Sequence, residues 1–141
     1  MSYIDSIVKG FQDVRDLLYE GFKTLDIPVE PIPTEAGYFL MVDISKCKDV
    51  IPEKYLSTHD YEDEPDPNIN KNRIYMDDGR IPLDLAFCRW IAVERGVIMM
   101  PNCLFYAPKS PFKTDNFVRV AICKGYDFSK KALERLQQAN K

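Results

Sequence analysis

The first 26 residues place apolar side chains at intervals of three and four. The recurring positions are Ile4, Ile7, Val8, Phe11, Val14, Leu18, Phe22 and Leu25. This period is typical of an amphipathic α-helix, and Ser2 followed by Asp5 has the spacing of a capping box at the helix start. Because Pro28 disfavours helical geometry in the residue before it, we expect the helix to end near Asp26.

Three later segments have the pattern of β-strands. Residues 38–44 and 117–123 alternate with a period of two, and residues 97–100 form a short apolar run that ends at Pro101. At the start of residues 38–44 both faces are apolar. We therefore expect this strand to be covered on both sides at one end.

Two later segments predict helices. Pro82 stands where its missing N–H is harmless, at a helix start, and Gly96 stands where a left-handed C-cap belongs. Residues 127–139 predict a closing helix with Asp127 or Ser129 as its N-cap. We expect the inward face of this last helix to carry Phe128, Leu133 and Leu136.

Residues 52–80 interrupt the pattern with clustered acidic residues and prolines. Loops longer than about 12–15 residues are uncommon in compact domains and are usually functional or mobile. We expect a flexible acidic surface loop here, and a solvated insertion is favoured over an acidic arm that binds a partner.

The order of elements predicts one α+β domain over residues 1–141. Its sheet is expected to be small and mostly antiparallel or mixed, with helices packed on one face. The formal net charge is −3 without a visible basic stripe, which argues against nucleic acid as a partner. Lacking a long apolar run and a signal-peptide pattern, the chain is expected to have no membrane span and a cytoplasmic location, with mitochondria as the alternative for a full-length protein.

The cysteines are isolated, and the single histidine is His59. Because the sequence has no CxxC motif or Cys/His pair at metal-binding spacing, we expect no metal site. Isolated cysteines in an intracellular chain are more often reduced, small apolar residues than members of a disulfide or metal site. We expect this role for Cys47, Cys88, Cys103 and Cys123.

Arg119 carries the clearest candidate chemistry. In residues 117–123, Val118, Val120 and Ile122 form a β-branched face that should point into the core, so Arg119 should project from the opposite face. A guanidinium group offers a rigid fork of donors that suits a carboxylate. The alternation alone leaves two interpretations open, a carboxylate clamp and an edge-exposed or internally paired arginine.

Four motifs follow one another along the chain. They are residues 37–45 (GYFLMVDIS), 87–97 (FCRW to ERGV), 100–106 (MPNCLFY) and 117–124 (FVRVAICK). Their order and spacing resemble the C-terminal small domain of class I/II, fold type I aminotransferases, which depend on pyridoxal phosphate. Within that family they resemble the kynurenine–oxoglutarate (glutamine–phenylpyruvate) transaminase group.

The resemblance implies roles for two residues of this chain. Arg119 would bind the α-carboxylate of the substrate, and Phe105 would lie near the substrate side chain. A core aromatic beneath the loop is the alternative for Phe105. Asn102 and Cys103 depart from the small residues that are usual in the family, which affects the expected shape of this loop and the side-chain specificity.

The resemblance also implies pyridoxal 5'-phosphate, bound by a large domain of the same polypeptide that supplies the cofactor lysine. We therefore expect no catalytic or cofactor-binding residue in this chain, and no turnover by the chain alone. The implied partners are an amino acid of kynurenine, glutamine or aromatic type, a 2-oxo acid, the large domain, and a second copy in a homodimer. The alternative is a non-catalytic, stand-alone carboxylate-binding or interaction module that has lost the cofactor-binding domain.

Overall fold

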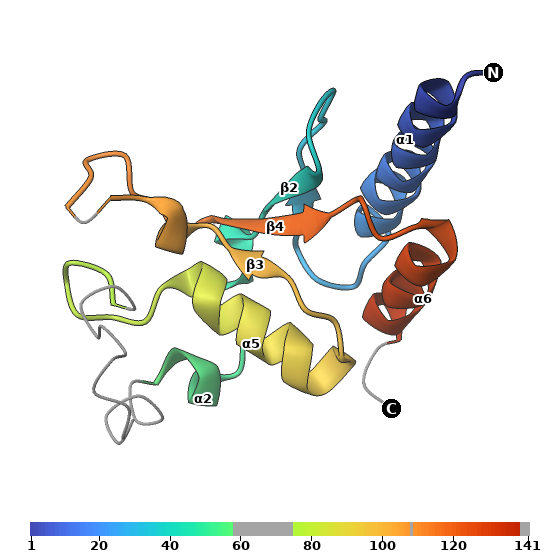
Figure 1. The fold of residues 1–141 in the computed structure, drawn as a ribbon. Helices are drawn as coiled ribbons and strands as arrows, with labels where there is room; N and C mark the ends of the chain where they lie inside the picture. Colours follow the sequence, from blue (N-terminus) through green and yellow to red (C-terminus); the bar gives the residue numbers. More distant parts are fainter. Residues whose placement is uncertain (58–74, 108, 139–141) are drawn as a thin grey trace, which may run out of the picture.

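The computed structural model describes residues 1–57, 75–107 and 109–138 (Figure 1). In chain order its main elements are α1 (Tyr3–Phe22), β1 (Glu30–Pro31), β2 (Phe39–Asp43), α2 (Glu53–Leu56), α5 (Leu83–Arg95), β3 (Met100–Pro101), β4 (Phe117–Ala121) and α6 (Tyr126–Gln137). Two 3-10 turns join them, η1 (Ser45–Cys47) and η2 (Cys103–Phe105). Most of the predicted acidic loop lies outside the described residues, and α2 forms in its first part.

The strands form one antiparallel sheet in the order β1-β2-β4-β3. Its two outer strands, β1 and β3, are two residues long and each contains a proline, Pro31 and Pro101. The α+β prediction is confirmed, with an antiparallel sheet.

One hydrophobic core joins the helices to one face of the sheet. Leu40 and Val42 of β2 and Val118 of β4 are fully buried in it. The helices α1, α5 and α6 contribute apolar side chains to the same cluster, and α1 packs against α6 at one end of the sheet (Figure 1). The alternate side chains of β2 and β4 lie on the other face, where they are only partly covered.

Both ends of α1 can be compared with the prediction. The capping box is confirmed, because Ser2 Oγ accepts from the Asp5 N–H and the Asp5 carboxylate accepts from the Ser2 N–H. The helix ends at Phe22, earlier than expected. There the backbone changes to three-residue turns, in which the Thr24 N–H bonds the Gly21 carbonyl.

The prediction for α6 is partly wrong. Gly125 is the N-cap, and no side chain caps this helix. Phe128 is 65% exposed, whereas Leu133 and Leu136 are buried as expected. The helical period explains the error, because the position four residues before Leu133 is Ser129, which is buried in place of Phe128.

The short strand and the second helix also differ from the prediction in detail. Residues 97–100 do not form the strand; β3 begins at Met100 and includes Pro101, which an edge strand tolerates. Pro82 is the N-cap residue of α5. The left-handed C-cap at Gly96 is confirmed, with φ at +68°.

Three of the four thiols are buried and one, Cys123, is exposed. Burial raises the pKa of Cys47 to about 12 and also raises the pKa values of Cys88 and Cys103, so these thiols stay protonated and pack as small apolar groups. In the described part of the chain, no three His, Cys, Asp or Glu side chains gather as metal ligands, and His59 lies outside that part.

Among the described helices, none has the length and apolar character needed to cross a membrane.

Gly21 marks a close approach of α1 to α6. A Cβ atom at Gly21 would lie 2.2 and 2.6 Å from the two methyl carbons of Leu133, whereas a Cβ at Gly10 of the same helix would meet nothing within 4 Å. We expect Gly21→Val to lower the free energy of unfolding by about 1–3 kcal/mol through overpacking, and Gly10→Val to be nearly neutral. Urea denaturation of both variants measures this difference. Equal shifts in the two variants would contradict the close approach.

Candidate functional site

Arg119 lies at the centre of the sheet. It is the middle residue of β4, opposite Met41 of β2 on one side and opposite Met100 of β3 on the other. Directly opposed residues in antiparallel strands share a face, so all three side chains project from the face away from the core. Arg119 is half-buried there, flanked by two thioether side chains.

Three side chains surround the guanidinium of Arg119. Its Nε–H donates to Asn102 Oδ1 over 2.8 Å. Its central carbon lies 4.0 Å from the centre of the Phe105 ring and 5.9 Å from the centre of the Phe39 ring. The structure thus brings together Arg119 and Phe105, the two residues singled out in the sequence.

The terminal nitrogens of Arg119, Nη1 and Nη2, make no hydrogen bond or ion pair with the described residues. In the described part of the chain Arg119 is hydrogen-bonded only through Nε, and it has no carboxylate partner there. Four N–H donors remain for a group from outside this chain, and they form the fork that fits a carboxylate.

Asn102 is the residue of the site that the sequence did not identify. It follows β3 directly and is 6% exposed. Its backbone N–H donates to the Phe117 carbonyl over 3.3 Å, and its Nδ2 lies 3.4 Å from the Tyr106 hydroxyl. The sequence marked Asn102 only as a departure from the family pattern, because its place beside Arg119 depends on the register of β3 against β4.

Asp84 anchors the turn that carries Asn102 and Phe105. Its fully buried carboxylate accepts from the Cys103 N–H over 2.6 Å and from the Leu85 N–H over 2.8 Å. Burial raises the pKa of this carboxyl group, and the hydrogen bonds from Cys103 and Leu85 oppose that effect. The first turn of α5 is therefore tied to η2, the turn that contains Phe105.

The start of α5 is also tied to the segment before β4. Asp115 accepts from the Leu83 N–H over 2.7 Å and forms an ion pair with Arg80. Burial alone would raise the pKa of Asp115, but the hydrogen bonds from Arg80 and Leu83 outweigh it and hold the pKa below its ordinary value. The charged Asp115 carboxylate thus caps α5, because the N-cap residue Pro82 has no side-chain oxygen that could accept this hydrogen bond.

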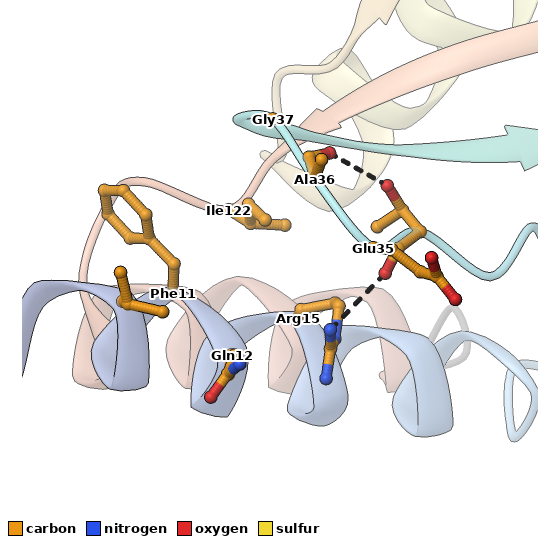
Figure 2. Close-up of a pocket in the computed structure, with 9 residues that line it drawn as sticks. Phe11, Gln12, Arg15, Glu35, Ala36, Gly37 and Ile122 are labelled. Carbon is orange, nitrogen blue, oxygen red and sulfur yellow. Dashed lines mark hydrogen bonds between the residues drawn. The ribbon is translucent and has the colours of Figure 1, made fainter. Parts of the chain in front are cut away.

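Two hollows in the described part of the chain lie away from Arg119. Figure 2 shows one of about 210 Å³ between α1 and residues 34–37, with Phe11, Arg15 and Ile122 along its wall. Arg15 donates there to the Thr34 carbonyl. The other is a shallow depression beside Asp16 and Tyr126. Arg119 lines neither of these two hollows.

This sheet face is apolar around Arg119. Phe39 and Met41 are half-buried on it, and the exposed side chains of Met100, opposite Arg119, and Phe105, against its guanidinium, continue the surface. In the part of the chain that the structure describes, Phe39 and Met41 are only partly covered on this face, whereas Leu40 and Val42 are buried on the other. Cover on both sides at one end of the strand at residues 38–44 therefore stays a prediction.

We expect the chain alone to self-associate through this face, because a contiguous apolar surface favours contact with a second copy. Sedimentation velocity over a concentration series measures this association. The variant Met41→Ser should weaken it, while Phe128→Ser, at an exposed position on α6, should not. A wild-type chain that sediments as a monomer at every concentration would contradict the prediction.

Comparison with known proteins gives a consistent result. No family model matches the chain. The probable kynurenine–oxoglutarate transaminase BNA3 of Saccharomyces cerevisiae is 31% identical over 103 residues, which are 73% of this chain and 19% of that protein. The crystal structure of Bna3p from the same yeast superposes on 96% of this chain with a TM-score of 0.66 at 25% identity, using 27% of its own length. The methionine aminotransferase YbdL of Escherichia coli gives a TM-score of 0.56 at 26% identity, over 92% of this chain and 24% of its own.

The chain matches the small domain of fold type I aminotransferases. This aminotransferase small domain spans about a fifth to a quarter of the length of the relatives it matches. In this small domain the guanidinium of Arg119, its contacts with Asn102 and Phe105, and the apolar residues around it lie together on the sheet face away from the core.

Proposed function

We propose that this small domain is part of a pyridoxal-phosphate-dependent aminotransferase that moves an amino group between an amino acid of kynurenine, glutamine or aromatic type and a 2-oxo acid. Arg119 holds the α-carboxylate of the substrate, and Phe105 lies beside its side chain. The observation that carries this proposal is the outward fork of Arg119, which has four N–H donors without partners among the described residues. The transaminase relatives support the class of reaction.

The geometry explains why a transaminase needs such a group. Transamination moves a proton at the α-carbon, so the amino acid must be held with that bond fixed relative to the cofactor ring. Two parallel N–H···O contacts to one carboxylate define a direction as well as a distance. The stacked ring of Phe105 and the bond to Asn102 fix the plane of the fork.

Pyridoxal phosphate supplies the electron sink of the reaction when it is bound. The residues of this chain fit the substrate side of that chemistry, since the charged group that faces outward is the Arg119 guanidinium, whose paired donors suit a carboxylate, in an apolar surface. In this proposal the cofactor is bound by a large domain of the same polypeptide, which covers the apolar face and excludes water from Arg119. A homodimer and a cytoplasmic location complete the proposal.

The test is transamination of L-kynurenine with 2-oxoglutarate by the natural polypeptide that contains this chain, assayed with added pyridoxal phosphate. We expect turnover by that polypeptide and none by the 141-residue chain alone. Turnover by the chain alone would contradict the proposal that a large domain of the same polypeptide binds the cofactor. Carboxylate binding at Arg119 in a natural polypeptide that shows no transamination would favour the alternative, a stand-alone binding module.

A further inference from the structure

Asn102 occupies one edge of the Arg119 guanidinium. Because Met100 lies opposite Arg119 in the antiparallel pair, Asn102 continues on the same face and sits diagonally across from it. Its amide oxygen reaches the Nε–H over 2.8 Å. The Nε donor is therefore already engaged within the chain, and among the described residues both terminal nitrogens keep their donors.

The chemistry fixes the orientation of this amide. An arginine side chain has donors and no acceptor, so the atom of Asn102 that faces Nε must be the oxygen, which directs Nδ2 toward the Tyr106 hydroxyl. The backbone of Asn102 is held at both ends, since its N–H bonds the Phe117 carbonyl and its carbonyl accepts from the Phe105 N–H. Asn102 is thus a buried, immobilised acceptor beside a long and otherwise mobile side chain.

We propose that Asn102 is a positioning residue that directs Arg119 to bind a carboxylate end-on, across Nη1 and Nη2. The inference rests on the proposed function of Arg119 as a carboxylate clamp and adds how that clamp is aimed. Asn102 engages Nε, and one face of the guanidinium lies against the Phe105 ring. The edge formed by Nη1 and Nη2 is the edge left for a ligand. Without Asn102 the side chain could rotate on the open sheet face, and its donors would no longer point in one direction.

A purely structural role for Asn102 is the competing explanation, because its contacts with Phe117 and Tyr106 also hold the loop. The two roles differ in what they change at Arg119. A structural residue affects stability, whereas a positioning residue affects the hydrogen exchange of the Arg119 Nε–H and the affinity for a carboxylate in a chain that is still folded.

The experiment uses the full chain labelled with ¹⁵N and two probes, L-kynurenine and kynuramine, which lacks the carboxylate. NMR follows the Arg119 Nε–H signal and gives the Kd of each probe. The variants are Asn102→Leu, which keeps the shape and removes the acceptor, and Asn102→Asp, which keeps the acceptor and adds a negative charge. Thermal unfolding is recorded for each variant to separate stability from binding.

For the wild type we expect a protected Nε–H signal and binding of kynurenine but not of kynuramine. In Asn102→Leu the Nε–H should exchange faster, and the Kd for kynurenine should rise about three- to tenfold, as expected for one hydrogen bond. In Asn102→Asp the Nε–H should stay protected while the Kd rises at least as much, because the new carboxylate competes for the same guanidinium charge.

Kynurenine binding that is unchanged in a folded Asn102→Leu variant would overturn the inference and leave the proposed function standing. If Asn102→Leu does not fold, an unchanged Kd in Asn102→Asp has the same meaning. If wild-type chain does not bind kynurenine through its carboxylate, the proposed role of Arg119 fails, and the inference about Asn102 fails with it.

Discussion

Arg119→Ala should weaken the binding of L-kynurenine to this domain about ten- to hundredfold or more. A hydrogen bond to a charged group contributes about 1.5–3 kcal/mol, and about 1.4 kcal/mol corresponds to a factor of ten in affinity. Arg119→Lys should also bind poorly, because a point charge cannot reproduce two parallel donors. NMR titration of the chain measures the affinity, and kcat/KM of the natural polypeptide measures the same loss in turnover.

Arg15→Ala is the matched control for this experiment. Arg15 lies on α1 beside the hollow in Figure 2, which Arg119 does not line, and it donates there to the Thr34 carbonyl. We expect this variant to bind kynurenine like the wild type. Loss of binding in Arg15→Ala together with full binding in Arg119→Ala would move the carboxylate site to the hollow.

Asp26→Ala should be among the most destabilising changes in the domain, lowering the free energy of unfolding by about 2–4 kcal/mol. The Arg95 side chain is only 4% exposed and forms a two-point ion pair with Asp26, at 2.9 and 3.2 Å. Arg95 also donates to the Leu136 carbonyl and lies over the Trp90 ring. Removing the carboxylate leaves a buried guanidinium without its counter-charge, at the point where α1, α5 and α6 meet.

Urea denaturation compares this variant with Asp16→Ala, which removes the partner of Arg15 in an exposed ion pair. An exposed pair contributes about 0–1 kcal/mol, so the control should change little. Similar losses of unfolding free energy in the two variants would show that the burial of Arg95 does not increase the contribution of its ion pair to stability. The side chain of Asp26 is 45% exposed, which places the expected loss below that of a fully buried pair.

The ion pair between Asp26 and Arg95 predicts part of the loss of stability at low pH. The hydrogen bond from Arg95 lowers the pKa of Asp26 below its ordinary value near 3.9. A carboxyl group with a lowered folded-state pKa stabilises the fold above its unfolded pKa and loses that contribution as the pH falls through the folded value. Unfolding free energies measured from pH 7 to pH 3 should therefore fall less steeply for Asp26→Asn than for the wild type. Parallel curves would contradict this assignment.

Local patterns predicted the elements whose signals are complete within a few residues. The capping box at Ser2 and the left-handed cap at Gly96 depend on neighbours close in sequence, and both are confirmed. The large apolar side chain of Phe128 predicts an inward position, but the helical period set by Leu133 places Ser129 there instead. Hydrophobicity alone could not determine which residues of α6 face the core.

The residues of the candidate site also differ in how far the sequence alone could predict them. Alternation along β4 was enough to direct Arg119 to the face away from the core, because one strand contains that information. Asn102 could not be recognised from its own segment, since its role requires the register in which Met100 opposes Arg119. Two residues 17 positions apart become partners only when β3 and β4 pair.

The prolines in the two outer strands limit how this sheet can meet another protein. Pro31 and Pro101 have no N–H to offer to an incoming strand, and each occupies half of a two-residue edge. Extension of the sheet by strand addition, the route by which many exposed edges recruit further chains into fibrils, is therefore blocked on both sides. The apolar surface around Arg119 can be left open for a partner without making the molecule a template for endless growth.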